Sequence, residues 1–286
     1  MTPPPPAAFV LGAGRAGRAL AWALRDAGVP LTGLHGRRAL HGPMPVSAGP
    51  LPAAIADADV VIVAVRDEQL DAALDELRHA PLAPRQVVLH LSGSREPAAL
   101  APLRAAGHPA GTFHPLVPLI GPESATALRG AWVGVDGDPA AIACARRLAG
   151  AVGAHVLRLP PGAKPAYHAA AVLASNFPVV LATLATRVLR ESGVEPEAAL
   201  GAVRALLTGA AHNVSVTVPE EALTGPVVRG DAGAVAAHLE ALAGDPTARA
   251  VYVALTRAAL ETRRAAGAEA SERLAAIDRL LGAGPG

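Results

Sequence analysis

The chain has 286 residues, of which 51% are hydrophobic and 17% are charged, and its formal net charge is +1. This length predicts two domains with cores of their own, and the balanced charge without a basic run argues against a nucleic-acid partner. The single cysteine, Cys144, excludes a disulfide framework and cysteine-pair metal sites, so we expect no metal and a small core side chain at that position.

The N-terminal segment, residues 1–6, has no charged start followed by an apolar stretch, so it does not resemble a signal peptide. No apolar run approaches the ~20 residues of a membrane span. We therefore expect a soluble, cytoplasmic protein without a membrane partner, and we expect the proline-rich and glycine-rich tails to be disordered.

The first predicted elements are a buried strand at residues 8–11 and a helix at 16–27, joined by a glycine turn. Gly12, Gly14 and Gly17 have the spacing G-x-G-x-x-G, in the strand–turn–helix context that dinucleotide sites require. The free N–H groups at the helix start would bind phosphates. The alternative is a glycine turn without a ligand. The predicted cofactor-binding residues of this region are Gly12, Ala13, Gly14, Arg15, Ala16 and Gly17, with Val65 at the end of the third strand.

The second predicted strand, residues 31–35, decides which dinucleotide fits. An NAD site usually has an acidic residue here for the ribose 2′-hydroxyl, but this strand is followed by Arg37 and Arg38. Two guanidinium groups suit a 2′-phosphate, because each offers a planar fork of donors. The sequence therefore predicts NADP(H). The alternative is that both arginines are solvated surface charges.

Further strands and helices alternate through the first half of the chain. An apolar strand at 60–65 is followed by Asp67, which is a candidate N-cap for the next helix. A strand at 86–91 ends at Ser92, a candidate substrate-binding residue. Shorter strands at 111–114, 132–135 and 155–159, with a helix from residue 139, complete the pattern of a doubly wound α/β sheet.

The alternation of strands and helices ends at residues 160–162, which read Pro-Pro-Gly, and no convincing strand follows. Helices are predicted at 165–191, 196–216, 231–242 and within 246–281, and Pro178 should kink the first of them. We therefore predict a cofactor-binding domain at 1–161 and a helical substrate and dimerisation domain at 162–286.

His114 is the first candidate catalytic residue. It follows a strand end, and the prolines at 115 and 118 hold the backbone around it extended. Because histidine titrates near neutral pH, His114 could pass a proton to a carbonyl or imine as hydride arrives. The alternative is a hydrogen-bonded loop histidine.

Lys164 is the only lysine among 25 basic residues, in a chain otherwise enriched in arginine, so we expect its chemistry to be needed. At helical spacing Lys164 and His168 share one face, and Tyr167 is adjacent. Lys164 could orient a substrate anion or donate a proton, with His168 as a further catalytic candidate and Tyr167 as a substrate-binding one. A surface lysine is the alternative. Asn176 points about 120° away from Lys164, toward a wall of the site or an interface.

Residues 223–231 form a third candidate segment with glycine and proline turn chemistry. Arg229 could bind a substrate carboxylate, in its own or a partner's cleft. Alternatively, Asp231 caps the next helix and Arg229 pairs with it.

The whole chain resembles proteins that combine a Rossmann-like domain with the DUF2520 domain. The resemblance rests on Phe113-His-Pro-Leu, on residues 164–177, and on Leu-Thr-Gly-Pro-Val-Val-Arg-Gly-Asp at 223–231. In layout it is similar to 6-phosphogluconate and β-hydroxyacid dehydrogenases, ketopantoate reductase, pyrroline-5-carboxylate reductase and prephenate dehydrogenase. These relatives imply a nicotinamide cofactor, a helical dimerising domain and a cleft between domains.

Two relatives' motifs match only in part. Gly162 and Lys164 match the G-x-K-x-x-N-N pattern of hydroxyacid dehydrogenases, but Tyr167 and His168 stand where its paired amides would be. The G-x-H-P loop of prephenate dehydrogenases is similar to the loop before His114, which has one residue more. The resemblance therefore names no substrate.

Together these patterns predict an NADP(H)-dependent oxidoreductase that acts on a small carbonyl, imine or hydroxyl substrate. Lys164 and His114 are the acid–base candidates. The alternative is a non-catalytic NADP(H)-binding sensor or regulator. Long apolar helix faces in an alanine-rich second domain predict a homodimer joined through that domain.

Overall fold

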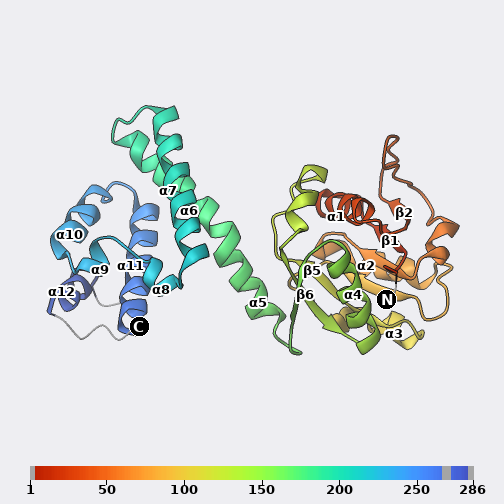
Figure 1. Cartoon of the computed structure of the whole chain (residues 1–286). Coiled ribbons are helices and arrows are strands. Elements are labelled where there is room, and N and C mark those ends of the chain that lie inside the picture. The colour runs from red at the N-terminus through yellow and green to blue at the C-terminus, as the bar shows by residue number, and fades with distance from the viewer. Residues whose placement is uncertain (1–3, 266–271, 283–286) are drawn as a thin grey trace. The chain divides into compact units, whose positions relative to one another are not determined.

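The structure is a computed structural model, and it describes residues 4–265 and 272–282 (Figure 1). The chain forms two compact units, Met1–Ser175 and Asn176–Gly286. The boundary between them lies later in the chain than the predicted one after residue 161, because the helix that follows Gly162 packs with the first unit. Parts of both predicted disordered tails, residues 1–3 and 283–286, lie outside the described residues.

The first unit is built around a seven-stranded sheet with the order β2-β1-β3-β4-β5-β6-β7. Only the pairing of β5 with β6 is antiparallel. The order reverses at β1, which is the switch point where doubly wound sheets bind ligands, and it confirms the predicted fold class. The strands are β1 (Ala8–Leu11), β2 (Leu31–His35), β3 (Val60–Val63), β4 (Val87–His90), β5 (Ala110–Pro115), β6 (Trp132–Gly137) and β7 (His155–Arg158).

Helices cover both faces of this sheet, because alternate strand residues point to opposite sides. On one face the helices α1 (Arg15–Asp26) and α4 (Pro139–Ala151) pack on the sheet, and Cys144 is buried there as predicted. On the other face α2 (Asp67–Arg78) and α3 (Ala101–Ala105) pack against Phe9, Val61 and Val63. The sheet therefore has an apolar core on each face.

Asp67 does not cap α2, which corrects the prediction from its position in the sequence. The helix begins at Asp67 with Arg66 as its N-cap residue, and no side chain caps it. The Asp67 carboxylate instead accepts a hydrogen bond from the Ser94 hydroxyl, in the loop after β4. A partner distant in sequence therefore competes successfully with the local backbone for this carboxylate.

A continuous helical segment joins the two units. It comprises α5 (Lys164–Ala171), a π-helical stretch η4 (Val172–Asn176), and α6 (Phe177–Glu191). The π stretch ends two residues before Pro178, which has no N–H to donate and whose ring would clash with the carbonyl four residues earlier, that of Ala174. The kink predicted at Pro178 stays a prediction, and the structure shows a π-helical stretch where the carbonyl in question lies.

The second unit contains helices and connecting turns, with no strand among its described residues. After α6 it contains α7 (Pro196–Val216), α8 (Pro219–Ala222), α9 (Pro226–Arg229), α10 (Ala232–Ala241), α11 (Pro246–Ala265) and α12 (Glu272–Leu280). A small apolar core joins α9 to α12 and includes Val235, Leu260 and Ile277. The predicted helices are present, and α8 and α9 are short additions that the turn chemistry did not reveal.

The segment Lys164–Glu191 is long and apolar enough to cross a membrane by length and composition alone. Its most apolar 18-residue window has a mean hydropathy of 1.7, and 6% of that window is buried. This corrects the expectation that no apolar run approaches such a length. One such helix is weak evidence for a membrane span, however, because the test considers length and composition only.

Candidate functional site

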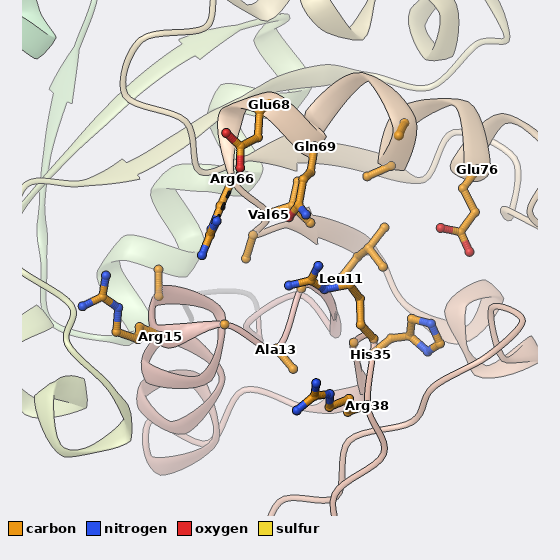
Figure 2. Close-up of a pocket in the computed structure, with 18 of the residues that line it drawn as sticks. Leu11, Ala13, Arg15, His35, Arg38, Val65, Arg66, Glu68, Gln69 and Glu76 are labelled. Atoms are coloured by element: carbon orange, nitrogen blue, oxygen red, sulfur yellow. Dashed lines mark hydrogen bonds and ion pairs between the residues drawn. The ribbon is translucent and has the colours of Figure 1, made fainter.

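A large cavity of about 1300 Å³ opens over the glycine turn between β1 and α1 (Figure 2). Its lining comes mainly from the carboxyl ends of β1, β2 and β3, from the first turn of α1, and from α2 as far as Glu76. Of the predicted cofactor-binding residues, Gly17 alone does not line it. The lining residues predicted from the sequence are Gly12, Ala13, Gly14, Arg15, Ala16, Arg37, Arg38 and Val65.

The three glycines of the turn differ in what a side chain would meet. Gly12 has a φ of +119°, and a Cβ there would lie 2.3 Å from the carbonyl oxygen of Ala64. A Cβ on Gly17 would lie 1.8 Å from the carbonyl oxygen of Gly12, so Gly17 serves helix–strand packing. A Cβ on Gly14 would meet nothing within 4 Å, which leaves the backbone open toward the cavity. This division of roles is the one that the spacing predicts.

The cavity is rich in guanidinium groups. Figure 2 shows the side chains of Arg15, Arg38 and Arg66 distributed around Ala13, and Arg37 also lines the cavity. Arg66, which the sequence reasoning missed, lies 3.4 Å from the carboxylate of Glu68. The sequence feature that could have identified Arg66 is its position directly after a buried strand, at the same sheet edge as the glycine turn. The surroundings favour an anionic ligand.

A second cluster forms where α5 meets the ends of β4 and β5, and Lys164 is at its centre. This side chain is 0% exposed, and its Nζ donates a hydrogen bond to the backbone carbonyl of Ser92 over 2.6 Å. Its backbone N–H also donates to the Glu96 carboxylate over 3.2 Å. Burial lowers the pKa of Lys164 to about 8, against the opposing carboxylates of Glu96, Asp136 and Asp67. The alternative of a surface lysine is therefore wrong.

His114 contacts Tyr167, which comes from the same helix as Lys164. The Tyr167 hydroxyl lies 2.7 Å from Nδ1 of His114, and the two rings meet edge to face. Burial, with the charges of Lys164 and His168, lowers the pKa of His114 to about 4. His114 is therefore neutral at pH 7, which corrects the expectation that it titrates near neutral pH.

Two glycines make room for these rings. A Cβ on Gly134 would lie 2.3 Å from the Tyr167 hydroxyl, and a Cβ on Gly93 would lie 2.5 Å from Nδ1 of His168 and 2.8 Å from Nε2 of His114. The His114 and His168 ring centroids are 6.0 Å apart. Only glycine therefore lets the backbone of β6 and of the loop after β4 approach the cluster so closely.

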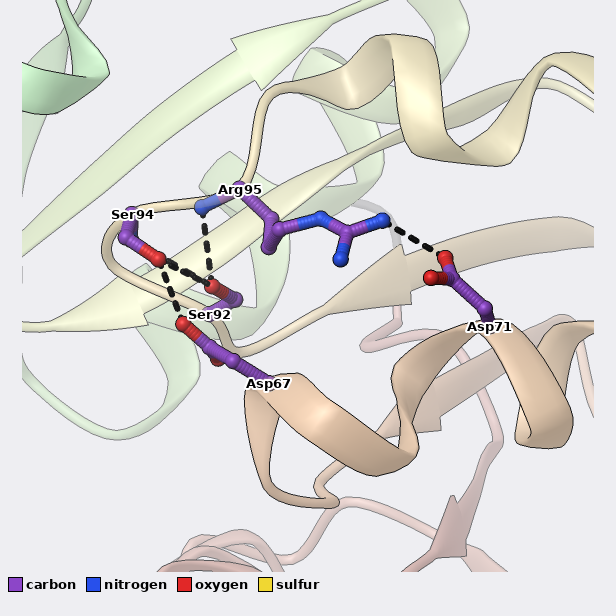
Figure 3. Close-up of polar contacts among 5 residues, drawn as sticks. All are labelled: Asp67, Asp71, Ser92, Ser94 and Arg95. Atoms are coloured by element: carbon purple, nitrogen blue, oxygen red, sulfur yellow. Dashed lines mark hydrogen bonds and ion pairs between the residues drawn. The ribbon is translucent and has the colours of Figure 1, made fainter.

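The loop after β4 is fixed by a polar network that reaches α2 (Figure 3). The Ser92 hydroxyl accepts hydrogen bonds from the backbone N–H groups of Ser94 and Arg95, over 3.3 and 2.9 Å. The Arg95 guanidinium pairs with Asp71 over 2.6 Å, and the Ser94 hydroxyl donates to Asp67. The hydroxyl of Ser92 is therefore engaged within the loop, while its carbonyl holds Lys164.

Asp67 lies in the chain between Arg66 and Glu68, which both line the cavity, and its carboxylate is bonded to this loop. Burial alone would raise the pKa of Asp67, but hydrogen bonds from Ser94 and Ser92 and the nearby imidazoles of His168 and His90 lower it below its usual value. Asp67 is therefore ionised at neutral pH.

His90, at the end of β4, is a member of the cluster that the sequence reasoning missed. It is 0% exposed, and neither ring nitrogen has a hydrogen-bond partner among the described residues. Burial and the charge of Lys164 lower its pKa to about 4, and a backbone contact with Glu96 opposes part of this effect. An imidazole inside an otherwise apolar strand was the signal that could have identified it.

Asn176 and Arg229 belong to the second unit, and their side chains are exposed. Their predicted contact with the substrate stays a prediction. Asp231 accepts a hydrogen bond from the backbone N–H of Ala234 over 3.0 Å, so it caps α10.

Within residues 4–265 and 272–282, no group of three or more His, Cys, Asp or Glu side chains is placed to hold a metal ion.

One protein family model matches a part of the chain that extends from the first unit into the second. Residues 131–259 match the family model described as Domain of unknown function (DUF2520). The match begins just before β6 and ends within α11, and it includes Lys164, Tyr167 and Arg229. It agrees with the resemblance found in the sequence. No curated protein matches the chain.

Solved structures share the fold along most of the chain. A protein of Bacteroides fragilis, provisionally named an NADP oxidoreductase, is 20% identical with a TM-score of 0.71, and the match covers 89% of this chain and 98% of that one. Protein TM1727 from Thermotoga maritima is 24% identical with a TM-score of 0.70, over 91% and 99% of the two chains. Pyrroline carboxylate reductase of Plasmodium falciparum, solved with NADP bound, is 12% identical with a TM-score of 0.64, over 92% and 98%. These likenesses establish the fold.

Proposed function

We propose that this chain, which carries a DUF2520 domain at residues 131–259, is an NADP(H)-dependent oxidoreductase. One observation carries the proposal. The cavity over the glycine turn is linked through Asp67 to the loop whose Ser92 carbonyl holds Lys164. A dinucleotide site thus adjoins a cluster of titratable side chains, as a reductase requires.

The cavity residues fit NADP(H). The backbone N–H groups at the start of α1, which Gly14 leaves uncovered, would hold the pyrophosphate. Arg37 and Arg38 would hold the 2′-phosphate, because no acidic residue follows β2 in the position that favours NAD. Bound there, the nicotinamide supplies or accepts the hydride. Fold neighbours that are named for NADP support this choice without extending their activities to this chain.

The polar cluster around Lys164 would supply the proton that accompanies the hydride. With a pKa of about 8, Lys164 keeps its proton at pH 7, whereas His114, with a pKa of about 4, has none to release as an acid. In the direction of reduction, the substrate carbon gains the hydride and its π pair moves to the attached oxygen or nitrogen. That atom then takes a proton from the Lys164 ammonium, which becomes an amine. The substrate is a small polar carbonyl, imine or hydroxyl compound.

We also propose that the protein is a homodimer joined through the second unit. No residue of α6 is buried, and only Ala199 and Val203 are buried in α7. Exposed apolar side chains on these two helices include Val179, Val180 and Leu206. Pairing of two copies would remove this surface from water. It also explains the apolar character of Lys164–Glu191 without a membrane, because Lys164, at the start of that segment, is bonded to the loop after β4.

Calorimetric titration of the purified chain with NADPH and NADH, followed by assays with keto acids, imines and hydroxy acids, tests the enzymatic proposal. We expect tight NADPH binding and turnover of at least one substrate class. Tight NADPH binding without turnover would favour a sensor or regulator. Absence of binding would refute both functions.

A further inference from the structure

The Tyr167 hydroxyl has two acceptors within reach but only one proton. It lies 2.7 Å from Nδ1 of His114 and 3.3 Å from the backbone carbonyl oxygen of His114. If the hydroxyl donates to Nδ1, the neutral imidazole carries its proton on Nε2. If the hydroxyl donates to the carbonyl, Nδ1 carries the proton and Nε2 is an acceptor. The choice decides what His114 offers to a ligand.

The geometry favours the first arrangement. The contact to Nδ1 has the length of a good hydrogen bond, while the contact to the carbonyl is at the long limit. A phenol is also a better donor than a neutral imidazole N–H, and an imidazole nitrogen is a better acceptor than a phenol oxygen. The Tyr167 hydroxyl therefore donates to an unprotonated Nδ1 of His114, and the imidazole carries its own proton on Nε2.

The surroundings hold this arrangement in place. The Tyr167 hydroxyl sits over Gly134, where a Cβ would lie only 2.3 Å from it, and a Cβ on Gly93 would lie 2.8 Å from Nε2 of His114, so no side chain of residue 93 blocks that nitrogen. The charged and titratable groups that act on His114 are Lys164 and His168 from α5 and Asp67 from α2. Burial and the two α5 residues keep the imidazole neutral well below pH 7, and burial raises the pKa of Tyr167, so neither group ionises at neutral pH.

We propose that Tyr167 is a positioning residue that holds His114 as a neutral Nε2–H donor, so that the site prefers a substrate with an acceptor oxygen. This inference rests on the proposed reductase function and names its substrate class. A carbonyl oxygen, or the hydroxyl oxygen in the reverse direction, accepts such a hydrogen bond, and the bond strengthens as negative charge develops. A protonated imine has no lone pair on nitrogen and gains nothing from this donor.

Nuclear magnetic resonance of the full chain labelled with ¹⁵N-histidine tests the tautomer without any assay of activity. Long-range ¹H–¹⁵N spectra distinguish protonated from unprotonated ring nitrogens, and a His114→Asn variant identifies the His114 signals. At pH 7 we expect Nε2 protonated and Nδ1 unprotonated, with no change down to pH 5. In Tyr167→Phe the Nδ1 signal should shift and both tautomers should be populated. A wild-type Nδ1–H tautomer, an imidazolium at pH 7, or an unchanged tautomer in Tyr167→Phe would overturn the assignment.

The substrate class is tested by assaying small 2-keto acids against cyclic imines with NADPH. We expect kcat/KM at least tenfold higher for the carbonyl compounds. In Tyr167→Phe, kcat for carbonyls should fall about tenfold, on the scale of one lost hydrogen bond, while the Kd for NADPH stays within twofold. A preference for imines would overturn the substrate class and leave the reductase intact. NADPH binding without turnover of either class would instead contradict the reductase, and the tautomer would still be decided by the spectra.

Discussion

Lys164 and Ser92 join α5 to the end of β4 through a hydrogen bond of 2.6 Å from Nζ to the backbone carbonyl. The two residues are far apart in the sequence, and the lysine is 0% exposed. A buried ammonium costs free energy unless hydrogen bonds compensate for lost hydration. Retaining the only lysine of the chain in this position therefore indicates a role beyond packing.

Replacement of Lys164 by Met should abolish turnover while the Kd for NADPH changes less than twofold. The reason is placement, since Lys164 does not line the cavity over the glycine turn. Steady-state kinetics and calorimetric titration measure the two quantities, and urea unfolding shows whether the variant is folded. Arg158→Met, which removes an exposed basic side chain from β7, is a matched control and should behave as wild type. A Lys164→Met variant with a third of the wild-type rate would exclude the lysine from the chemistry.

Replacement of His114 by Asn should lower kcat by ~10²–10³, the scale for loss of one donor to a developing oxyanion. Because the pKa of His114 is about 4, the wild-type rate should show no acid limb from this residue between pH 5 and 8. Rate measurements across that range check both statements, with His155→Asn on β7 as the control. A loss under threefold would assign His114 a purely structural role.

The free energy of unfolding should fall as the pH is lowered from 6.5 toward 4. His90 and His114 have folded-state pKa values of about 4 against an ordinary value of 6.5, so in this window the unfolded chain binds protons that the folded chain does not. Each histidine contributes a slope of up to about 1.4 kcal/mol per pH unit, and its stabilisation is fully present above pH 6.5.

Urea unfolding of His90→Phe at several pH values isolates one of these contributions. In the variant, the slope of the free energy of unfolding against pH should decrease by the contribution of one titrating group. The variant should be no less stable at pH 7, because both nitrogens of His90 lack partners among the described residues. An unchanged slope would mean that His90 is hydrated or protonated in the folded protein.

Light scattering at micromolar concentration should give the mass of a dimer. Leu206 is 72% exposed on α7, so Leu206→Glu should shift the protein toward the monomer if this face forms the interface. Arg204→Glu, a neighbouring change of a polar residue, serves as the control. A monomer mass for the wild-type chain would refute the proposed dimer.

The sequence predicted those features that depend on local pattern. The glycine turn and the arginines after β2 were identified because strand, turn and helix follow one another within a short stretch, and the cavity lies where they predict. The predicted cap at Asp67 was wrong because Ser94, which is remote in sequence, captures the carboxylate. The burial of Lys164 and the presence of His90 in the cluster depend on how α5 packs on the sheet. A local sequence pattern does not contain that information.

The most direct test of the account is the ratio of the Kd values for NADH and NADPH, measured by calorimetry on the wild-type chain and on Arg37→Ala/Arg38→Ala. Both arginines line the cavity after β2. We predict that the wild type binds NADPH at least tenfold more tightly than NADH, and that the double variant loses this preference while its affinity for NADH changes little. Wild-type binding of NADPH no tighter than that of NADH would contradict the account.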